Sequence, residues 1–210
     1  MYIKELFRQP NFSDLRDLPF VNTVIFDMDG TLLDTEENHA HALLMTLNEI
    51  RPEHNFSITQ LKNDFLGLSD LDVFKKLNIE SVTFSYFLER KNNHYTRTLL
   101  ENNTSLTESM RIFFKDLKDE KYKLALVTAS ERQVAIATLE QVDILNEFDE
   151  ILCRDDLEKS KPHPLPYLKM MERLSSTKER TLIFEDSETG LASAKASGAN
   201  YIKASWFSIS

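Results

Sequence analysis

The stretch VNTVIFDMDGTLLDT, residues 21–35, gives the clearest indication of how this chain folds. It begins with a largely apolar run of strand length, and three aspartates follow within eight residues. Apolar runs of this kind are typical of strands buried in a parallel sheet. Ligands of an open parallel α/β sheet bind beyond the carboxyl ends of its strands. The stretch therefore predicts a buried strand with a charged site at its carboxyl end.

Apolar runs of strand length alternate with helical patterns along most of the chain, which is the layout of a parallel sheet covered by helices. We therefore expect an α/β fold with a Rossmann-like parallel sheet as its core. The predicted strands are residues 21–26, 122–128, 150–153, 181–185 and 201–204. The predicted helices of the core are residues 106–119, 131–142, 163–174 and 188–197. Thr107 or Ser105 is the expected N-cap of the first of these helices.

One region departs from this alternation, because residues 35–103 show helical patterns and no convincing strand. An insertion of this length is far longer than an ordinary connection. It predicts a helical cap domain at 35–103, inserted into a core made of residues 1–34 and 104–210. We expect residues 1–20 to pack on the core as a helix and assign them no function. The helical patterns of the insertion are residues 35–50, 57–66, 69–77 and 81–100.

Composition limits the class of protein. The 210 residues, 41% hydrophobic and 28% charged, are those of an ordinary globular protein with room for one domain and an insertion. The formal net charge of -9 argues against nucleic acid or an anionic membrane as a partner. The single cysteine, Cys153, rules out an intrachain disulfide, and the sequence has no apolar run of membrane-spanning length and no signal-peptide core. We expect a cytoplasmic monomer.

Two pairs of acidic residues follow predicted strands. Asp27 and Asp29 lie at the end of the first strand, and Glu185 and Asp186 lie at the end of the strand 181–185. Neighbouring carboxylates repel each other and raise each other's pKa unless a cation neutralises them. Oxygen ligands without histidine or cysteine favour Mg²⁺ over zinc. These residues therefore predict a magnesium site or acid/base chemistry at the strand ends.

Two other strand ends carry groups that suit a phosphate. Thr128, Ala129 and Ser130 offer a hydroxyl and free amides ahead of a helix, an arrangement suited to oxyanions. Lys161 follows the next predicted strand. Each group alone is weak evidence, because a strand-end threonine or a Lys-Pro pair is more often part of a solvated turn. It is their coincidence with the two acidic pairs that indicates a phosphate site.

The order and spacing of these groups resemble the four motifs of the haloacid dehalogenase (HAD) superfamily of phosphotransferases. The insertion resembles the helical C1 cap of subfamily I. DTEENH at 34–39 and the loop Gly67-Leu68-Ser69 are similar to the group that contains β-phosphoglucomutase and sugar-phosphate phosphatases. The resemblance covers residues 21–204. The four motifs are DMDGT at 27–31, VTAS at 127–130, KPHP at 161–164 and FEDSETG at 184–190.

The resemblance implies a chemical role for the acidic residues. Asp27 would attack phosphorus in line and form an aspartyl-phosphate. Asp29 would act first as general acid and then as general base. Mg²⁺ would bind the carboxylates of Asp27 and Asp186 and the backbone carbonyl of Asp29, with Glu185 as a neighbour or further ligand.

Substrate binding is implied for both domains. Thr128, Ala129 and Lys161 would bind the phosphoryl oxygens of a small phosphorylated metabolite. His39 stands where mutases of the group carry a cap histidine that handles a sugar hydroxyl, and it can equally be a polar residue that lines a cleft. The aromatic residues of the insertion are expected to form its hydrophobic core rather than a base-stacking platform. These residues are Phe65, Phe74, Phe84, Tyr86 and Phe87.

Three functions stay open. The first is a Mg²⁺-dependent phosphatase that hydrolyses a small phosphomonoester such as a sugar phosphate. The second is a sugar-phosphate mutase like β-phosphoglucomutase; Thr31 and Asp70 argue against it, since mutases of the group commonly carry valine and a basic residue there. The third is a non-catalytic protein that binds a phosphorylated ligand or a protein partner. The residues that argue against it are the intact Asp27, Asp29, Lys161 and Asp186. Carbon–halogen cleavage is disfavoured because dehalogenases of the superfamily lack the second aspartate.

Overall fold

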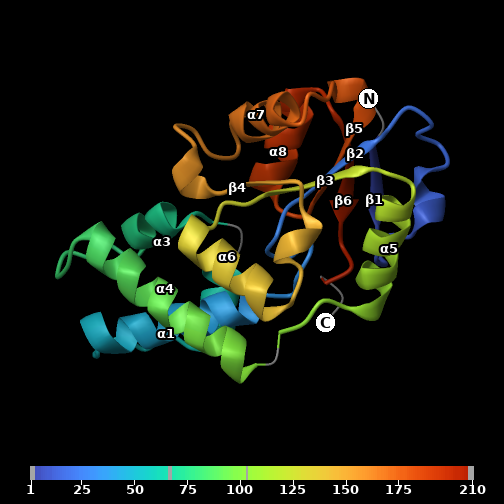
Figure 1. The fold of residues 1–210 in the computed structure, drawn as a ribbon. Coiled ribbons are helices and arrows are strands. Elements are labelled where there is room, and N and C mark those ends of the chain that lie inside the picture. Colours follow the sequence, from blue (N-terminus) through green and yellow to red (C-terminus); the bar gives the residue numbers. More distant parts are fainter. Residues whose placement is uncertain (1–2, 66–67, 103, 208–210) are drawn as a thin grey trace. The chain divides into compact units, whose positions relative to one another are not determined.

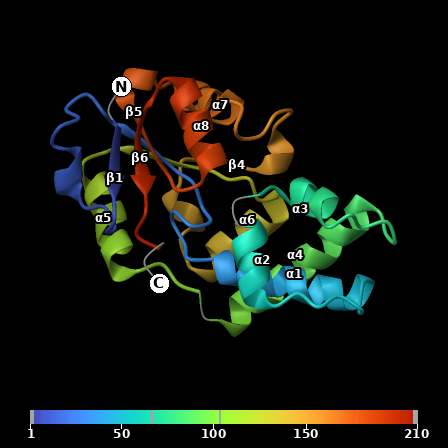
Figure 2. The same cartoon turned by 180° about the vertical axis from the view of Figure 1, so that it is seen from behind.

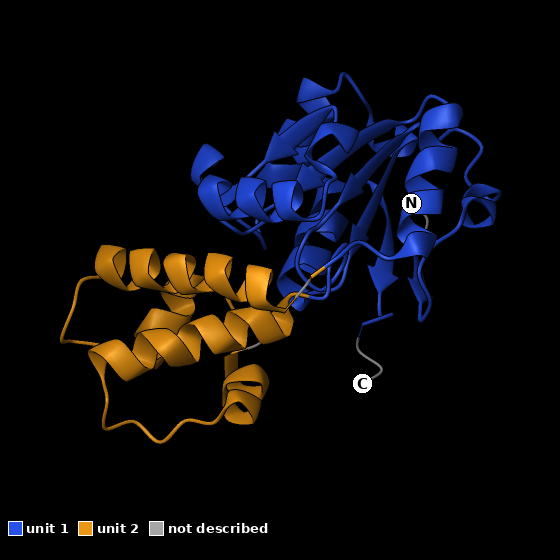
Figure 3. Ribbon diagram, turned by 60° about the horizontal axis from the view of Figure 1, so that its bottom comes forward, with its two compact units in different colours: residues 1–34, 105–210 blue, residues 35–104 orange. Residues whose placement is uncertain are grey.

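The computed structural model describes residues 3–65, 68–102 and 104–207. Contacts divide the chain into two compact units (Figure 3), each of which is described by itself. Unit 1 joins Met1–Asp34 to Ser105–Ser210, and unit 2 is Thr35–Thr104. Among the described residues, no helix combines the length and the apolar character that crossing a membrane requires.

Unit 1 contains a six-stranded parallel sheet in the order β1-β6-β5-β2-β3-β4 (Figure 1). The predicted α/β fold class is therefore confirmed. The five predicted strands correspond to β2 through β6, with ends that differ by two residues at most. The strands are β1 (Ile3–Leu6), β2 (Thr23–Phe26), β3 (Lys123–Val127), β4 (Glu150–Leu152), β5 (Thr181–Glu185) and β6 (Asn200–Ala204).

Each face of the sheet is packed against two helices, because alternate residues of a strand point to opposite faces. Phe26 and Phe184 lie in a hydrophobic cluster with residues of α5 and α6. Ile25 and Ile183 lie in a second cluster with residues of α7 and α8. Burial on both faces explains the continuous apolar runs of β2 and β5. The helices are α5 (Glu108–Asp119), α6 (Arg132–Gln141), α7 (Leu165–Arg173) and α8 (Glu188–Ser197), and Thr107 is the N-cap of α5.

Within the described part of residues 1–20, Ile3–Leu6 form a strand and only a short 3-10 helix, Phe12–Leu15, is helical, which corrects the expectation of a helix. β1 lies beside β6 at the edge of the sheet (Figures 1 and 2), with Ile3 opposite Tyr201 and Leu6 opposite Ala204. Of the four residues of β1 only Leu6 is buried. An edge strand pairs on one side alone and tolerates charged residues. Its apolar pattern is therefore too weak to be told from that of a surface helix.

Asp14 ties this N-terminal segment together. Its carboxylate accepts hydrogen bonds from Lys4 Nζ at 3.2 Å, from the two terminal nitrogens of Arg8 at 2.8 and 2.9 Å, and from Asn11 N at 3.0 Å. Burial raises the pKa of the Asp14 carboxyl, but these donors outweigh burial and hold the pKa below its ordinary value. The ionised carboxylate therefore stabilises the folded chain.

We expect Asp14→Asn to lower the free energy of unfolding at pH 7 by about 1–3 kcal/mol, because an amide lacks the charge that Arg8 and Lys4 bind. A carboxyl with a depressed pKa contributes stability above its unfolded pKa of about 4, and this stability is lost as pH falls through the folded pKa. Urea unfolding at pH 7 and pH 3 measures the effect, with exposed Asp17→Asn as the control. A destabilisation of equal size at both pH values would contradict the role of the charge.

The described residues of unit 2 form four helices around their own hydrophobic core. Phe65 and Phe87 are buried in this core, and Phe74 and Phe84 pack against it. The expectation that Tyr86 belongs to the core is wrong, because this side chain is 46% exposed on a different face of its helix from its neighbour Phe87. The helices are α1 (Glu36–Ile50), α2 (Ile58–Phe65), α3 (Asp70–Lys76) and α4 (Phe84–Glu101). Leu66, the last residue of the predicted helix 57–66, and Gly67 of the quoted loop lie outside the described residues.

Candidate active site

The carboxyl ends of β2, β3 and β5 lie side by side at one edge of the sheet in unit 1. The register pairs Phe26 at the end of β2 with Leu126 on β3 and with Phe184 on β5. Asp27 N donates a hydrogen bond to Phe184 O at 3.0 Å, which extends the ladder by one residue. Residues that follow these strands therefore meet at one edge, where ligands of parallel sheets bind.

Lys161 joins two of the strand ends through its ammonium group. Its Nζ lies 2.6 Å from Asp27 Oδ1 and 2.6 Å from Glu185 Oε2, and it donates to Val127 O at 3.0 Å. These bonds use all three ammonium protons. The side chain of Lys161 is 6% exposed. Burial lowers the pKa of this group, but the charges of Asp27 and Glu185 outweigh burial and raise the pKa well above its ordinary value, so that the lysine stays charged.

Asp27, Glu185 and Asp186 form a cluster of three carboxylates. One oxygen of each lies within 4.8 Å of the others. Burial first, and the charge of Glu185 second, raise the pKa of Asp27 well above its ordinary value and raise the pKa of Asp186 to about 7. Lys161 supplies one positive charge against these three carboxylates. The cluster is therefore short of positive charge, and its oxygen donors fit a hard divalent cation.

Glu185 has hydrogen-bond donors on both of its oxygens. Oε2 accepts from Lys161 Nζ and from Tyr167 OH, each at 2.6 Å. Oε1 accepts from Ser187 Oγ at 2.9 Å and from the backbone N–H groups of Asp186 and Ser187 at 3.2 Å. Since Glu185 is fully buried, these bonds compensate a charge that water does not reach.

The turn after β2 holds Asp186. Thr31 Oγ1 donates to Asp186 Oδ1 at 2.8 Å, and Thr31 is fully buried. Gly30 has φ 76°, a conformation that residues with a Cβ rarely adopt, and a Cβ at this position would overlap the Asp186 carboxylate. Gly30 N closes the turn by donating to Leu33 O at 2.8 Å. Both the backbone conformation and the approach of Asp186 therefore require glycine here.

The turn after β3 holds Asp29. Ser130 Oγ donates to Asp29 Oδ2 at 2.8 Å, and Ser130 N donates to Thr128 Oγ1 at 3.0 Å. Thr128 is 3% exposed, whereas Ala129 is exposed between β3 and α6. The ends of β2 and β3 are thus connected by a hydrogen bond that fixes one oxygen of the Asp29 carboxylate.

His39 belongs to a polar cluster in unit 2. Its ring, on α1, stacks on that of Tyr95 with the centroids 4.2 Å apart, and Lys91 Nζ lies 3.4 Å from His39 Nδ1. Lys91 is 5% exposed and forms an ion pair of 2.5 Å with Asp70 Oδ1. The other predicted site residues all belong to unit 1.

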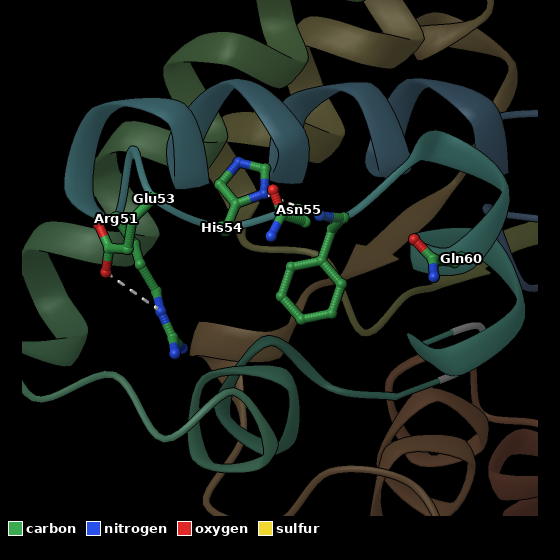
Figure 4. Close-up of a pocket in the computed structure, with 6 residues that line it drawn as sticks. Arg51, Glu53, His54, Asn55 and Gln60 are labelled. Atoms are coloured by element: carbon green, nitrogen blue, oxygen red, sulfur yellow. Dashed lines mark hydrogen bonds and ion pairs between the residues drawn. The ribbon is translucent and has the colours of Figure 1, made fainter.

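Unit 2 also has a pocket of about 370 Å³ (Figure 4). None of the predicted site residues, all of which the structure describes, lines it. Its polar side chains bind the surrounding chain: Arg51 Nη1 donates to Leu77 O at 3.1 Å, and His54 Nε2 lies 3.0 Å from Asn48 Oδ1. The pocket therefore lacks the groups of the predicted chemistry. Its lining residues are Arg51, Glu53, His54, Asn55, Phe56 and Gln60.

Side chains outside the predicted catalytic, binding and metal-ligand sets also donate hydrogen bonds to the predicted carboxylates: Thr31, Ser130, Tyr167 and Ser187. Thr31, Ser130 and Ser187 lie inside the quoted motifs, so that their positions pointed to the site. Tyr167 lies six residues after Lys161 in an amphipathic helix, where a tyrosine of the hydrophobic core has the same pattern. Its contact could not be read from the sequence.

Comparisons with known proteins relate most of the chain to one family. The family described as haloacid dehalogenase-like hydrolase matches residues 24–204. Pyrophosphatase PpaX of Bacillus mycoides (strain KBAB4) is 32% identical over 190 residues, which cover 89% of this chain and 84% of the relative. The crystal structure of CbbY from Rhodobacter sphaeroides in complex with phosphate matches 87% of this chain and 85% of its own with a TM-score of 0.79 at 21% identity. β-Phosphoglucomutase from Clostridium difficile matches 87% and 84% with a TM-score of 0.74 at 22% identity. These two structures share the fold.

Proposed function

The chain belongs to the haloacid dehalogenase-like hydrolase family, and we propose that it is a Mg²⁺-dependent phosphatase that hydrolyses a small phosphomonoester through an aspartyl-phosphate on Asp27. This family membership confirms the resemblance to the haloacid dehalogenase superfamily that the four sequence motifs indicated. The observation that carries the proposal is the environment of Asp27. Its carboxylate lies at the end of β2, pairs with the ammonium of Lys161, and belongs to a cluster with two further carboxylates. Such a cluster suits a nucleophile that works beside a cation.

The reaction takes two displacements at phosphorus. An oxygen of Asp27 attacks, a P–O bond to Asp27 forms, and the ester P–O bond breaks while Asp29 gives its proton to the leaving oxygen. Asp29 then takes a proton from water, which attacks the phosphoryl group, and the bond to Asp27 breaks to release phosphate. The hydrogen bond from Ser130 to Asp29 Oδ2 supports this role, because it orients the carboxylate between the two steps.

The phosphoryl group needs positive charge and hydrogen-bond donors. Lys161 supplies a buried ammonium next to Asp27, where it stabilises the charge on the transferring oxygens. Thr128 and Ala129, in the turn after β3, are the further candidates to bind these oxygens. We assign unit 2 the selection of the substrate, as the cap domain predicted from residues 35–103, and His39 the contact with the substrate beyond its phosphate. The buried Lys91 beside His39 supports a polar partner there.

Mg²⁺ fits the donor set of the carboxylate cluster. Asp27 and Asp186, with the backbone carbonyl of Asp29, would hold the ion, and Glu185 would lie next to it with its oxygens already bound by protein donors. The ion would neutralise charge that otherwise repels a phosphate dianion. Every proton in the reaction is still moved by Asp29.

We expect Thr31→Val to raise the Mg²⁺ concentration that gives half-maximal activity about tenfold, because valine keeps the buried shape but removes the hydrogen bond that orients Asp186. Activity at saturating Mg²⁺ should stay within a few-fold of the wild type. A Mg²⁺ titration of phosphate release measures this. Thr138→Val, which removes a buried hydroxyl bonded within α6, is the matched control. An unchanged Mg²⁺ requirement would show that Thr31 does not act on a metal ligand.

The substrate class is a small phosphomonoester, of which sugar phosphates are the leading candidates. Inorganic pyrophosphate, a phosphoanhydride rather than an ester, is a separate candidate because the relative at 32% identity is named a pyrophosphatase. A mutase is the alternative. Against it, Asp70 stands where mutases of the group commonly carry a basic residue, and its charge is paired with Lys91. The cytoplasmic location and the monomeric state stay predictions.

The test is phosphate release from a panel of sugar phosphates, nucleotides, other small phosphomonoesters and inorganic pyrophosphate, with Mg²⁺ and with EDTA. Release of phosphate that depends on Mg²⁺ supports the proposal, and the ranking of the compounds identifies the preferred leaving group. No release from any compound would overturn it. Conversion of β-glucose 1-phosphate to glucose 6-phosphate would then indicate the mutase, and its absence a binding protein.

A further inference from the structure

Tyr167 touches both partners of the buried ion pair that holds the nucleophile. It lies on α7 and is fully buried. Its hydroxyl donates to Glu185 Oε2 at 2.6 Å, the same oxygen that lies 2.6 Å from Lys161 Nζ. Nζ also lies 5.3 Å from the centroid of the Tyr167 ring, within the range of a cation–π contact. A core position for packing alone does not need a hydroxyl.

The other side of Glu185 is equally enclosed. Ser187, the N-cap of α8, and two backbone N–H groups bind Oε1. A Cβ at Gly190 would overlap the Glu185 carboxylate, so that glycine lets the first turn of α8 close over it. Glu185 is therefore a fixed negative charge whose Oε2 is shared between two donors, Lys161 and Tyr167.

This arrangement determines where the ammonium of Lys161 points. Of its three bonds, the one to Asp27 faces the nucleophile, whereas those to Glu185 and Val127 O anchor it to the protein. When a phosphoryl group arrives at Asp27, Lys161 can exchange the first bond for a phosphoryl oxygen only if the other two keep Nζ in place. The position of the Glu185 carboxylate therefore decides how well Lys161 meets the transferring group.

We propose that Tyr167 is a positioning residue for phosphoryl transfer: by holding Glu185, it fixes the ammonium of Lys161 against Asp27. The expected effect of Tyr167 on kcat rests on the proposed function. Its effect on the position of Lys161 follows from the contacts alone. Removing the hydroxyl frees Oε2 from one of its two donors and lets the buried pair shift. Lys161 then samples positions away from Asp27, which costs transition-state stabilisation more than substrate binding.

Tyr167→Phe is the test, because it removes the hydroxyl and keeps the ring. Tyr201→Phe is the control, since Tyr201 packs against the same hydrophobic cluster on β6. For Tyr167→Phe we expect kcat to fall about tenfold, with KM and the half-saturating Mg²⁺ concentration within about twofold of the wild type. A merely structural role would lower the unfolding temperature without this split between kcat and KM. A kcat within twofold of the wild type, or a loss that appears in the Mg²⁺ requirement instead, would overturn the proposal.

A second measurement does not depend on activity. Competitive labelling of lysine amines, followed by mass spectrometry, reports the accessibility of Lys161 relative to the exposed Lys159. Lys161 should react several-fold faster in Tyr167→Phe than in the wild type or in Tyr201→Phe. An unchanged labelling rate would overturn the positioning role even if the wild type releases phosphate. Faster labelling in a protein that hydrolyses no phosphate compound would leave the positioning of Lys161 intact and defeat the proposed function alone.

Discussion

Asp27→Asn is expected to abolish phosphate release and to leave the folded protein at least as stable as before. Asparagine has the shape of aspartate but is not a nucleophile toward phosphorus, so that no phosphoenzyme forms. Loss of a nucleophile commonly costs about four or more orders of magnitude in kcat. The variant should therefore fall to the background of the assay for every compound that the wild type hydrolyses.

The stability part of this prediction follows from the electrostatics of the cluster. Burial and the neighbouring carboxylates raise the pKa of Asp27, which means that folding disfavours its ionised form relative to the unfolded chain. A neutral amide removes this repulsion. The unfolding temperature of Asp27→Asn in EDTA should thus equal or exceed that of the wild type.

Phosphate release and thermal unfolding in EDTA are the two measurements for Asp27→Asn. Asp34→Asn is the matched control, because Asp34 belongs to the same stretch of sequence and is exposed. Retention of more than about one hundredth of the wild-type kcat would contradict the assignment of Asp27 as nucleophile. A large fall in stability would contradict the picture of a cluster short of positive charge.

Lys161→Ala is expected to damage both activity and stability. It removes the one ammonium that Asp27 and Glu185 share and leaves two buried carboxylates without it. Breaking a buried ion pair from one side costs about 3–5 kcal/mol. Phosphate release should fall by about three orders of magnitude, because the proposed reaction also loses the charge that would stabilise the transferring oxygens.

The pH dependence of the Lys161→Ala effect has a definite sign. Lys161 lowers the pKa of Asp27, so its removal raises this pKa further. An acid whose folded pKa is raised is destabilising when ionised, and this penalty disappears as pH falls and the group binds a proton. The loss of stability should therefore be larger at pH 8 than at pH 5. Urea unfolding in EDTA at the two pH values tests this, with the exposed Lys159→Ala as control. A loss that is independent of pH would mean that packing, rather than charge, accounts for it.

The core strands could be predicted because they are buried on both faces. β2 and β5 are largely apolar runs, Asp27 follows β2, and β5 ends in Glu185, so that both the strand and its charged end are visible in the sequence. β1 could not be predicted, because its pairing with β6 rests on backbone hydrogen bonds at a sheet edge and only one of its residues is buried. An edge strand with few buried residues produces only a weak apolar pattern in the sequence.

The predicted site residues at strand ends could be identified from the sequence, as the buried strands could, whereas contacts made from helices could not. Asp27 and Glu185 lie at the ends of the neighbouring strands β2 and β5, and parallel pairing brings such ends together whatever their distance along the chain. Lys161 lies in a loop well after the edge strand β4, so that its approach to these carboxylates does not follow from strand pairing. Tyr167 contacts Glu185 from a helix, where the side-chain direction depends on packing that the sequence does not reveal. The role of His39 depends on the ligand, and its cluster with Lys91 in unit 2 was likewise not apparent from spacing.

Trapping the aspartyl-phosphate on Asp27 tests the proposed covalent step. Asp29→Asn lacks the base that activates water, and an aryl phosphate has a leaving group that departs without a proton, so that the variant should accumulate a phosphoenzyme. We would incubate it with an aryl phosphate labelled in its phosphoryl group and Mg²⁺, quench in acid, and map the label by peptide mass spectrometry. Label is expected on the peptide that carries Asp27, and hydroxylamine should remove it, as it does from an acyl phosphate. Turnover of the aryl phosphate by the wild type with no label in the variant, or label on another residue, would contradict the proposed covalent step.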